Sequence, residues 1–318
     1  MKITELLAQS TGPLLSYEII PPKRGGSVAE TLAVVEDLMP FDPPFIDVTS
    51  HSAEAYYEEM SDGTWRRHVK RKRPGTLGLC AAIKSRFGVE SVPHLLCQGF
   101  TREETEDALI ELNYLGIQNV MALQGDDGGF KKTVPPGKSC NGYAIDLVGQ
   151  ISEMNQGHYL EDLMDAAPTD FCIGVAGYPE KHFEAPNLMW DILRLKRKVD
   201  AGAHYVTTQM FFDNRHFFDF VERCRDVGID VPIVPGLKIL TRKSHLQLLP
   251  SRFHVDIPEA LAAEVEAAKP EHAVDIGVEW ARAQCEELLD AGVPCIHFYI
   301  MQRSQVVRRV VEPLRKMA

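Results

Sequence analysis

The sequence of 318 residues lacks several features that would place it in common classes of protein. No apolar run is long enough to span a membrane, and the first ten residues contain no apolar core segment typical of a secretory leader. The seven cysteines include no C-x-x-C pair, and their odd number argues against a full set of disulfides. We therefore expect a cytoplasmic protein with reduced thiols and no membrane partner.

Motifs for nucleotides and metals are also missing. No G-x-G-x-x-G follows a strand-like run, and 135–139 lacks the first glycine of a phosphate loop because Lys132 stands at that position. His94 and Cys97 form an isolated pair, and His182 belongs to no H-x-x-x-H motif. The net charge of −11 argues against nucleic acid as the main partner. We expect neither a metal site nor a nucleic-acid partner.

One basic segment departs from this acidic balance. It is RRHVKRKR, at 66–73. Its simplest interpretation is a solvated helix end and loop. The alternative is a local attractor for an anionic part of a ligand.

Short apolar runs alternate with amphipathic helical patterns along the chain, and no low-complexity linker divides them. Eight runs are predicted as strands: 16–20, 45–50, 92–97, 119–125, 171–178, 205–212, 232–237 and 295–301. This order predicts a single (β/α)8 TIM barrel over residues 1–318, with an open doubly wound sheet as the alternative. Two helical patterns within 250–290 predict an extra helix before the last strand.

Barrel enzymes carry their chemistry at the carboxyl ends of the strands, and polar residues gather at those positions here. They are Glu18, Thr49, His51, His94, Gln124, Asp126, Tyr178, Gln209, Gln302 and Arg303. The alternative is that strand ends are polar because they meet solvent. Glu18 stands out because it lies inside the apolar run SYEII, where an unpaired carboxylate is costly to bury.

Two further segments suggest ligand binding. Gly125 and Asp126 end a strand and precede a long polar loop rich in glycine and proline, a length that is uncommon unless the loop is functional or disordered. In the helix predicted at 187–201, Asp191, Arg194 and Lys198 fall on one stripe, away from the apolar face. That stripe could hold a ribose and a phosphate, or it could be an exposed row of ion pairs.

The combination of motifs resembles the methylenetetrahydrofolate reductase family. The matching pieces follow the family's order over nearly the whole chain: YEIIPPK, VPHLLC, NVMALQGD, YAIDLV, VAGYPEKH, DILRLKRKVDAGA, TTQMFFD, PIVPGL and HFYIMQR. The chain ends after the barrel, so it resembles the bacterial form without a regulatory carboxyl-terminal domain.

The resemblance implies a barrel enzyme of one-carbon metabolism. NAD(P)H would reduce bound FAD, and the reduced flavin would pass hydride to 5,10-methylenetetrahydrofolate, giving 5-methyltetrahydrofolate by a ping-pong mechanism. Glu18 matches the general acid that protonates the leaving nitrogen of the folate ring. Asp126 matches a second catalytic carboxylate near flavin and pterin. Relatives form homo-oligomers, so we expect one here.

The resemblance also assigns binding residues. Those matching FAD contacts are Thr49, His94, Gln124, Gly125, Asp126, Tyr143, Ala144, Tyr178, His182, Asp191, Arg194, Arg197 and Lys198. Those matching substrate contacts are Asp126, Gln209, His245 and Arg303.

The sequence departs from the family at three positions. Gln124 replaces an arginine found in many relatives, Arg194 replaces an asparagine, and Leu249 stands where some relatives have an aromatic residue. Two alternative functions remain open. One is a reductase of the same fold fed by ferredoxin or a partner protein, and the other is a non-catalytic barrel that binds folate or flavin.

Overall fold

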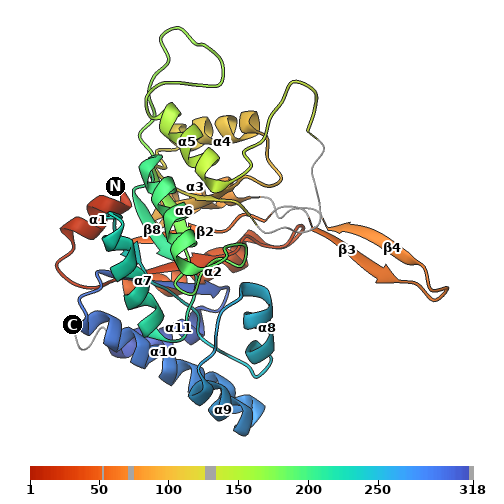
Figure 1. Ribbon diagram of the computed structural model, residues 1–318, viewed down its shortest axis with the longest axis vertical. Helices are drawn as coiled ribbons and strands as arrows, with labels where there is room; N and C mark the ends of the chain where they lie inside the picture. The colour runs from red at the N-terminus through yellow and green to blue at the C-terminus, as the bar shows by residue number, and fades with distance from the viewer. Residues whose placement is uncertain (52–53, 71–74, 126–133, 315–318) are drawn as a thin grey trace.

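The computed structural model describes residues 1–51, 54–70, 75–125 and 134–314, and its centre is a ring of parallel strands (Figure 1). β9 (Ile233–Val234) and β10 (Gly236–Leu237) are separated only by Pro235, which has no N–H to donate. The carbonyl of Pro235 accepts a bond from the amide of His297, and the ring closes at this point. The order around the ring confirms the predicted TIM barrel, and 232–237 forms two short strands instead of one. In sequence the strands are β1 (Leu14–Ile19), β2 (Phe45–Val48), β5 (Glu90–Leu96), β6 (Asn119–Leu123), β7 (Cys172–Gly177), β8 (Tyr205–Thr208), β9 (Ile233–Val234), β10 (Gly236–Leu237) and β11 (Cys295–Met301).

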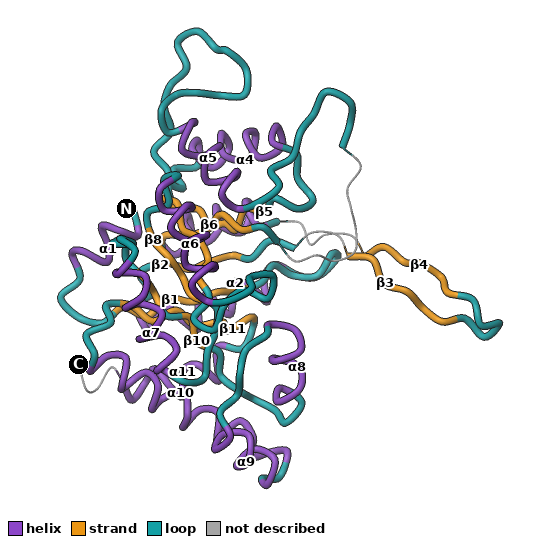
Figure 2. The backbone as a smooth tube through the Cα atoms, in the orientation of Figure 1, coloured by secondary structure: helices purple, strands orange, loops and turns teal. Residues whose placement is uncertain are grey.

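Helices cover the outside of the ring (Figure 2). They are α2 (Val28–Leu38), α3 (Thr76–Phe87), α4 (Arg102–Tyr114), α5 (Ala144–Met154), α6 (Leu188–Asp200), α7 (Asn214–Asp226), α10 (Ala273–Asp290) and α11 (Ser304–Leu314). α8 (His245–Phe253) and α9 (Glu259–Ala267) precede α10, so the predicted extra helix before the last strand is confirmed. Within the described ranges, none of the helices is apolar over a length that could cross a bilayer.

Local sequence signals explain where individual helices begin and end. The Thr101 hydroxyl accepts a bond from the amide of Glu104, and the Glu104 carboxylate accepts one from the amide of Thr101, which is the predicted capping box of α4. Gly116 follows that helix with φ of +67°, a conformation that favours glycine. On α6, Ile192 and Leu195 are buried against the barrel, as the apolar spacing predicted.

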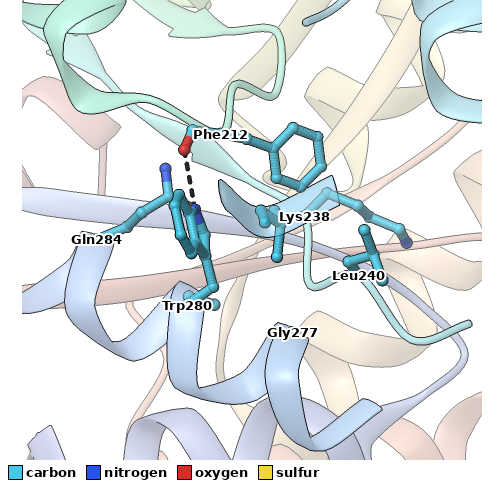
Figure 3. Close-up of a pocket in the computed structure, with 8 residues that line it drawn as sticks. Phe212, Lys238, Leu240, Gly277, Trp280 and Gln284 are labelled. Carbon is cyan, nitrogen blue, oxygen red and sulfur yellow. Dashed lines mark hydrogen bonds between the residues drawn. The ribbon is translucent and has the colours of Figure 1, made fainter. Parts of the chain in front are cut away.

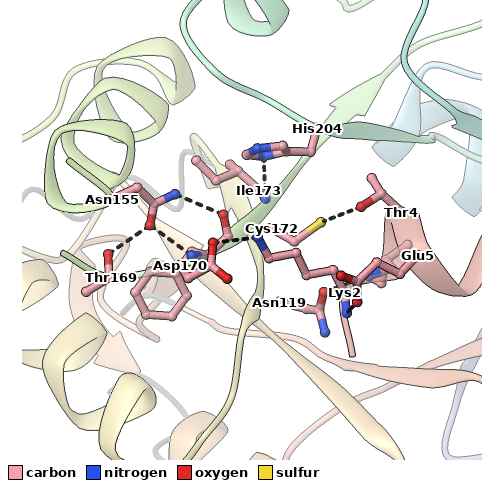
Figure 4. Close-up of polar contacts among 12 residues, drawn as sticks. Lys2, Thr4, Glu5, Asn119, Asn155, Thr169, Asp170, Cys172, Ile173 and His204 are labelled. Carbon is pink, nitrogen blue, oxygen red and sulfur yellow. Dashed lines mark hydrogen bonds and ion pairs between the residues drawn. The ribbon is translucent and has the colours of Figure 1, made fainter.

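The amino-terminal helix α1 (Ile3–Gln9) covers the end of the barrel at which the strands begin. The amide of Ile3 donates to the Asn119 side chain (2.9 Å), and that side chain donates back to the carbonyl of Met1 (2.9 Å). Figure 4 shows two further contacts of this segment, Lys2 with Asp170 and Thr4 with Cys172. Ile3 and Leu7 pack on an apolar cluster made by the strands: Phe45, Val92, Met121, Cys172, Tyr205, Val234 and Cys295. The end of the barrel at which the strands begin is therefore closed. The active site is expected at the opposite end, where the strands finish.

The basic segment does not form a helix end. Its first residues lie in β4 (Trp65–Lys70), which pairs antiparallel with β3 (Glu54–Glu59) in a hairpin that projects from the barrel (Figure 1). The helical interpretation of 66–73 is therefore wrong for 66–70, and 71–73 lie outside the described residues. Paired strands satisfy the backbone groups of this insertion, and a polar turn at Asp62 and Gly63 reverses the chain. Arg66 and Arg67 are exposed, as expected of a solvated segment.

Candidate active site

Glu18 lies at the carboxyl end of β1, inside the barrel. Its side chain is 12% exposed, and its backbone pairs with Asp47 of β2 on one side and with Tyr299 of β11 on the other. Burial raises the pKa of Glu18 to about 7, against the opposing charges of His94 and Lys238, while the negative charge of Asp47 adds to the rise. Near neutral pH this carboxyl is therefore present both as an acid and as a base.

His94, near the end of β5, faces two carboxylates at once. Its Nε2 lies 3.1 Å from Oδ2 of Asp47 and 3.7 Å from Oε2 of Glu18. Burial alone lowers the pKa of His94, but the hydrogen bond to Asp47 and the charges of Glu18 and Asp47 outweigh it, and the net pKa is raised. The two carboxylates therefore favour the protonated form of this buried imidazole.

A second cationic group, the amine of Lys238, lowers the pKa of Glu18. Lys238 follows β10, and its amine donates to the carbonyl of Tyr299 at 2.6 Å. Burial lowers the pKa of Lys238 to about 8, although the charge of Glu18 raises it. In Figure 3 the Lys238 amine points away from Trp280, whose indole donates to the carbonyl of Phe212 (2.9 Å). The pocket drawn there is too small to hold a water molecule, so it is packing that supports the lysine.

Two predicted substrate residues lie near Lys238. His245 is buried, and its Nδ1 accepts a bond from the amide of Thr241 (3.3 Å). Burial and the charges of Arg242, Lys238 and Arg303 lower its pKa to about 4, so the ring is neutral. The guanidinium of Arg303 is exposed and donates to the Thr241 hydroxyl at 3.2 Å.

The predicted flavin contacts on α6 are anchored to the end of β7. The Asp191 carboxylate is buried and accepts a bond from the amide of His182 (2.8 Å), and the Lys198 amine donates to the carbonyl of Ala176 (2.6 Å). Burial lowers the pKa of Lys198 to about 8, and Asp191 opposes this effect. Arg194 and Arg197 are exposed. The stripe predicted from sequence is therefore half buried, not an exposed row of ion pairs.

Other predicted contacts sit on neighbouring strand ends. Thr49 is buried beside His51, with 3.1 Å between its Oγ1 and the Nε2 of His51. The backbone amide of Gln209 donates to the carbonyl of Gly177 at 2.8 Å. Gly125 follows β6 with φ of +90°, which explains why glycine stands there. The remaining predicted contacts are Gln124 before Gly125, Tyr143 and Ala144 at the start of α5, and Tyr178, whose ring lies edge-on to His182. Asp126 lies outside the described residues.

A cavity of ≈ 180 Å³ opens beside His94. It lies among the end of β5, the loop after β2 and the adjacent ends of α3 and α4. Its lining is mostly apolar: Ser50, Gly75, Thr76, Leu77, Gly78, His94, Leu95, Leu96, Phe100, Thr105 and Ala108. Such a lining with a few polar groups suits an aromatic ligand.

Sequence reasoning missed three residues of this site. Asp47 and His297 lie within apolar strands and are each 1% exposed, and Lys238 follows a strand directly. The signal that singled out Glu18, an ionisable residue inside an apolar run, was present for Asp47 in FIDVTS and for His297 in CIHFYIM. Leu249, the position of an aromatic residue in some relatives, is 3% exposed and packs in the apolar core.

Comparisons with known proteins agree with this geometry. A sequence model of the methylenetetrahydrofolate reductase family matches residues 2–315. Methylenetetrahydrofolate reductase 2 of Saccharomyces cerevisiae is 31% identical over 99% of this chain, which spans half of that relative's length. The 5,10-methylenetetrahydrofolate reductases of Salmonella typhimurium and Escherichia coli are 31% and 30% identical; the matches cover 96% of this chain and 92% of each enzyme.

A solved structure supports the fold. An uncharacterized protein from Clostridium thermocellum, which binds two copies of 5-methyl-5,6,7,8-tetrahydrofolic acid, aligns with a TM-score of 0.60 and 14% identity, covering 99% of this chain and 98% of that one. At that identity the likeness concerns the fold alone. The family match over nearly all of the sequence, together with bacterial relatives at 30% identity or more over most of their length, shows that the chain belongs to the methylenetetrahydrofolate reductase family.

Proposed function

We propose that this protein reduces 5,10-methylenetetrahydrofolate to 5-methyltetrahydrofolate with NAD(P)H, through bound FAD and by a ping-pong mechanism. Family membership supports the reaction. The observation that carries the mechanism is Glu18, a nearly buried carboxyl with a pKa of about 7, whose Oε2 lies 3.7 Å from Nε2 of His94.

The donor set of the chain fits FAD. Arg194, Arg197 and Lys198 bring three cationic groups together on α6, as the diphosphate of FAD requires. Gly125 has no Cβ and a positive φ, so the backbone after β6 can approach a flat ring system closely. When bound, FAD would supply the hydride transfer, which no side chain can perform.

Glu18 has the properties of a general acid for opening the folate ring. Opening needs a proton on the leaving nitrogen before hydride arrives at the carbon. A carboxyl whose pKa is about 7 holds that proton near neutral pH and still releases it readily, which is the balance a general acid requires. Its location at the end of β1 places it where the substrates of barrel enzymes bind.

Three residues are assigned to the folate. His245 is neutral, and its Nδ1 accepts a bond from the amide of Thr241, so its Nε2 carries the hydrogen and can donate to the substrate. Arg303 offers an exposed guanidinium next to it, which suits a carboxylate of the substrate. Gln209, directly after β8, contributes its side-chain amide, whose oxygen accepts a bond from the backbone amide of Met210 (2.9 Å).

Anaerobic assays of the purified protein test the proposal. Flavin bands should bleach on adding NADH or NADPH and return on adding 5,10-methylenetetrahydrofolate, with 5-methyltetrahydrofolate identified by mass spectrometry. Bleaching only by reduced ferredoxin would favour a reductase fed by a protein. Folate or flavin binding without turnover would favour a non-catalytic barrel.

A further inference from the structure

Asp47 is the most deeply buried carboxylate at the barrel mouth among the described residues, and packing alone gives no reason for it. It is 1% exposed, and its Oδ1 has no hydrogen-bond partner in the described part of the chain. Its Oδ2 contacts His94 at 3.1 Å. A buried carboxylate with one satisfied oxygen is costly, and a small apolar residue would fill a strand position without that cost. Such a group is a candidate for function.

The geometry shows what Asp47 does to His94. One ring nitrogen, Nε2, faces both Asp47 (3.1 Å) and Glu18 (3.7 Å). Carboxylates accept hydrogen bonds, so Nε2 carries a hydrogen, and the shorter distance assigns that hydrogen bond to Asp47. Glu18 lies just beyond hydrogen-bond distance, so a small movement of its carboxylate brings it to the same N–H.

We infer that Asp47 is a positioning residue for the general acid: it fixes the His94 imidazole beside Glu18, so that the ring stabilises the carboxylate left when Glu18 gives its proton to the substrate. This inference rests on the proposed function. The proton leaves Glu18 for the leaving nitrogen, the bond between that nitrogen and the methylene carbon breaks as the iminium forms, and His94 keeps its own proton. Without the stabilising cation, a carboxylate would form in a buried site at high cost.

Charged and titratable groups face Glu18 from four elements. Burial is the largest effect on its pKa; among the charges, His94 of β5 lowers it more than Asp47 of β2 raises it, and Lys238 after β10 lowers it as well. Tyr299 of β11 completes the surroundings. With asparagine at position 47 the amide oxygen can still accept a hydrogen bond from His94, but the negative charge that favours the protonated imidazole is lost. Because the effect of His94 is the larger, the pKa of Glu18 should then rise.

His297 of β11 is the remaining ionisable group near His94. Its Nδ1 lies 2.9 Å from the hydroxyl of Ser16, and burial lowers its pKa to about 4. His297 is therefore neutral, and it cannot replace Asp47 as the partner of the cationic His94.

The test compares Asp47→Asn with a matched control, Asp37→Asn. Asp37 is a carboxylate on α2 that accepts side-chain bonds from Ser304 and Gln305, and it belongs to none of the residues assigned to the site. In Asp47→Asn, the rate of flavin reoxidation by 5,10-methylenetetrahydrofolate should fall about tenfold. Its pH midpoint should move up by at most about one pH unit, because loss of the His94 charge raises the pKa of Glu18 more than loss of the Asp47 charge lowers it. Flavin reduction by NAD(P)H should stay within about threefold, since no proton from Glu18 enters that step.

An unchanged midpoint in Asp47→Asn, or one that moves down, would overturn the inference, because damage to the fold lowers a rate without raising a midpoint. The Asp37→Asn control should leave both rates and the midpoint as they are. A midpoint that rises equally in the control would also count against the inference.

A titration of His94 reads the same contact without turnover. Nitrogen NMR of histidine-labelled protein should show a His94 imidazole whose midpoint lies above that of an ordinary histidine, assigned by the signal that is lost in His94→Gln. Asp47→Asn should lower that midpoint, and an unchanged His94 midpoint would refute the inference. If the protein fails to reduce 5,10-methylenetetrahydrofolate, the proposed function falls, while this comparison still decides whether Asp47 holds the proton on His94.

Discussion

Replacing Glu18 by Gln separates the two half-reactions of the proposed mechanism. Glutamine keeps the size and most of the hydrogen bonding of the side chain but has no acidic proton. With a pKa of about 7, the carboxyl is about half protonated at pH 7, and only about 1% is protonated at pH 9. Loss of a general acid lowers a rate by about 10² to 10⁴, or roughly 3 to 5 kcal/mol of barrier. We expect that loss in the folate half-reaction, while flavin reduction by NAD(P)H stays within about tenfold.

Stopped-flow absorbance of the flavin measures both half-reactions on one preparation. In the wild-type protein the folate half-reaction should also slow as the pH rises above 7, whereas Glu18→Gln should remove that dependence together with the rate. An equal loss in both half-reactions would mean that Glu18 shapes the barrel mouth or positions the flavin. A folate half-reaction that survives the substitution would move the acid role to another residue or to water.

The same substitution should stabilise the fold above neutral pH. The folded state binds the Glu18 proton more tightly than the unfolded chain does, because the pKa rises from 4.5 to about 7 and the side chain is only 12% exposed. Ionising it in the folded state therefore lowers the free energy of unfolding by about 3 kcal/mol. This loss is absent below pH 4.5 and reaches its full size above pH 7. Thermal unfolding of Glu18→Gln should show the gain at pH 8 and none at pH 4. A gain of the same size at both values would contradict the assigned pKa.

Three other outcomes follow from the site. The purified protein should be yellow and should release roughly one FAD per chain on denaturation, and release of FMN would refute the cofactor assignment. Asp191→Ala and Lys198→Ala should lower FAD retention in gel filtration more than Arg223→Ala, whose ion pair with Asp219 is exposed, and an equal effect would return α6 to a structural role. Arg303→Ala should raise the KM for folate about tenfold with little change in kcat, since an exposed guanidinium binds ground state and transition state alike; a fall in kcat alone would contradict that role.

The barrel could be predicted because its signals are local and repeated. Each apolar run became a strand, and caps such as Thr101 with Glu104 marked the helices between them. The hairpin of β3 and β4 was missed because its charged residues show no apolar alternation, while strand pairing across a turn satisfies its backbone groups. Pro235 was inside a predicted strand, yet its missing N–H divides that strand in two.

The site was predicted only in part, for a physical reason. Glu18, Thr49 and His94 lie at strand ends, and parallel strands bring such ends together. Sequence gives the position of each residue but not the distances between residues on different strands. Asp47 was therefore passed over, although it lies 3.1 Å from His94. The family resemblance also gave no role to Lys238, whose importance comes from burial and from the charge of Glu18.

The barrel interior contains ionisable groups in a buried site, where a charge is costly. The layer of side chains near the starts of the strands is apolar and is covered by α1. The ionisable groups near the ends of the strands therefore have little access to solvent through that layer. In that setting burial alone would make Glu18 too weak an acid to give up its proton readily near neutral pH. The charges of His94 and Lys238 lower the pKa of Glu18 against burial, whereas the charge of Asp47 raises the pKa of both Glu18 and His94. The resulting pKa of about 7 is a balance among three strands and the segment after β10, so a substitution at any of the four residues should be read first as a change in that balance.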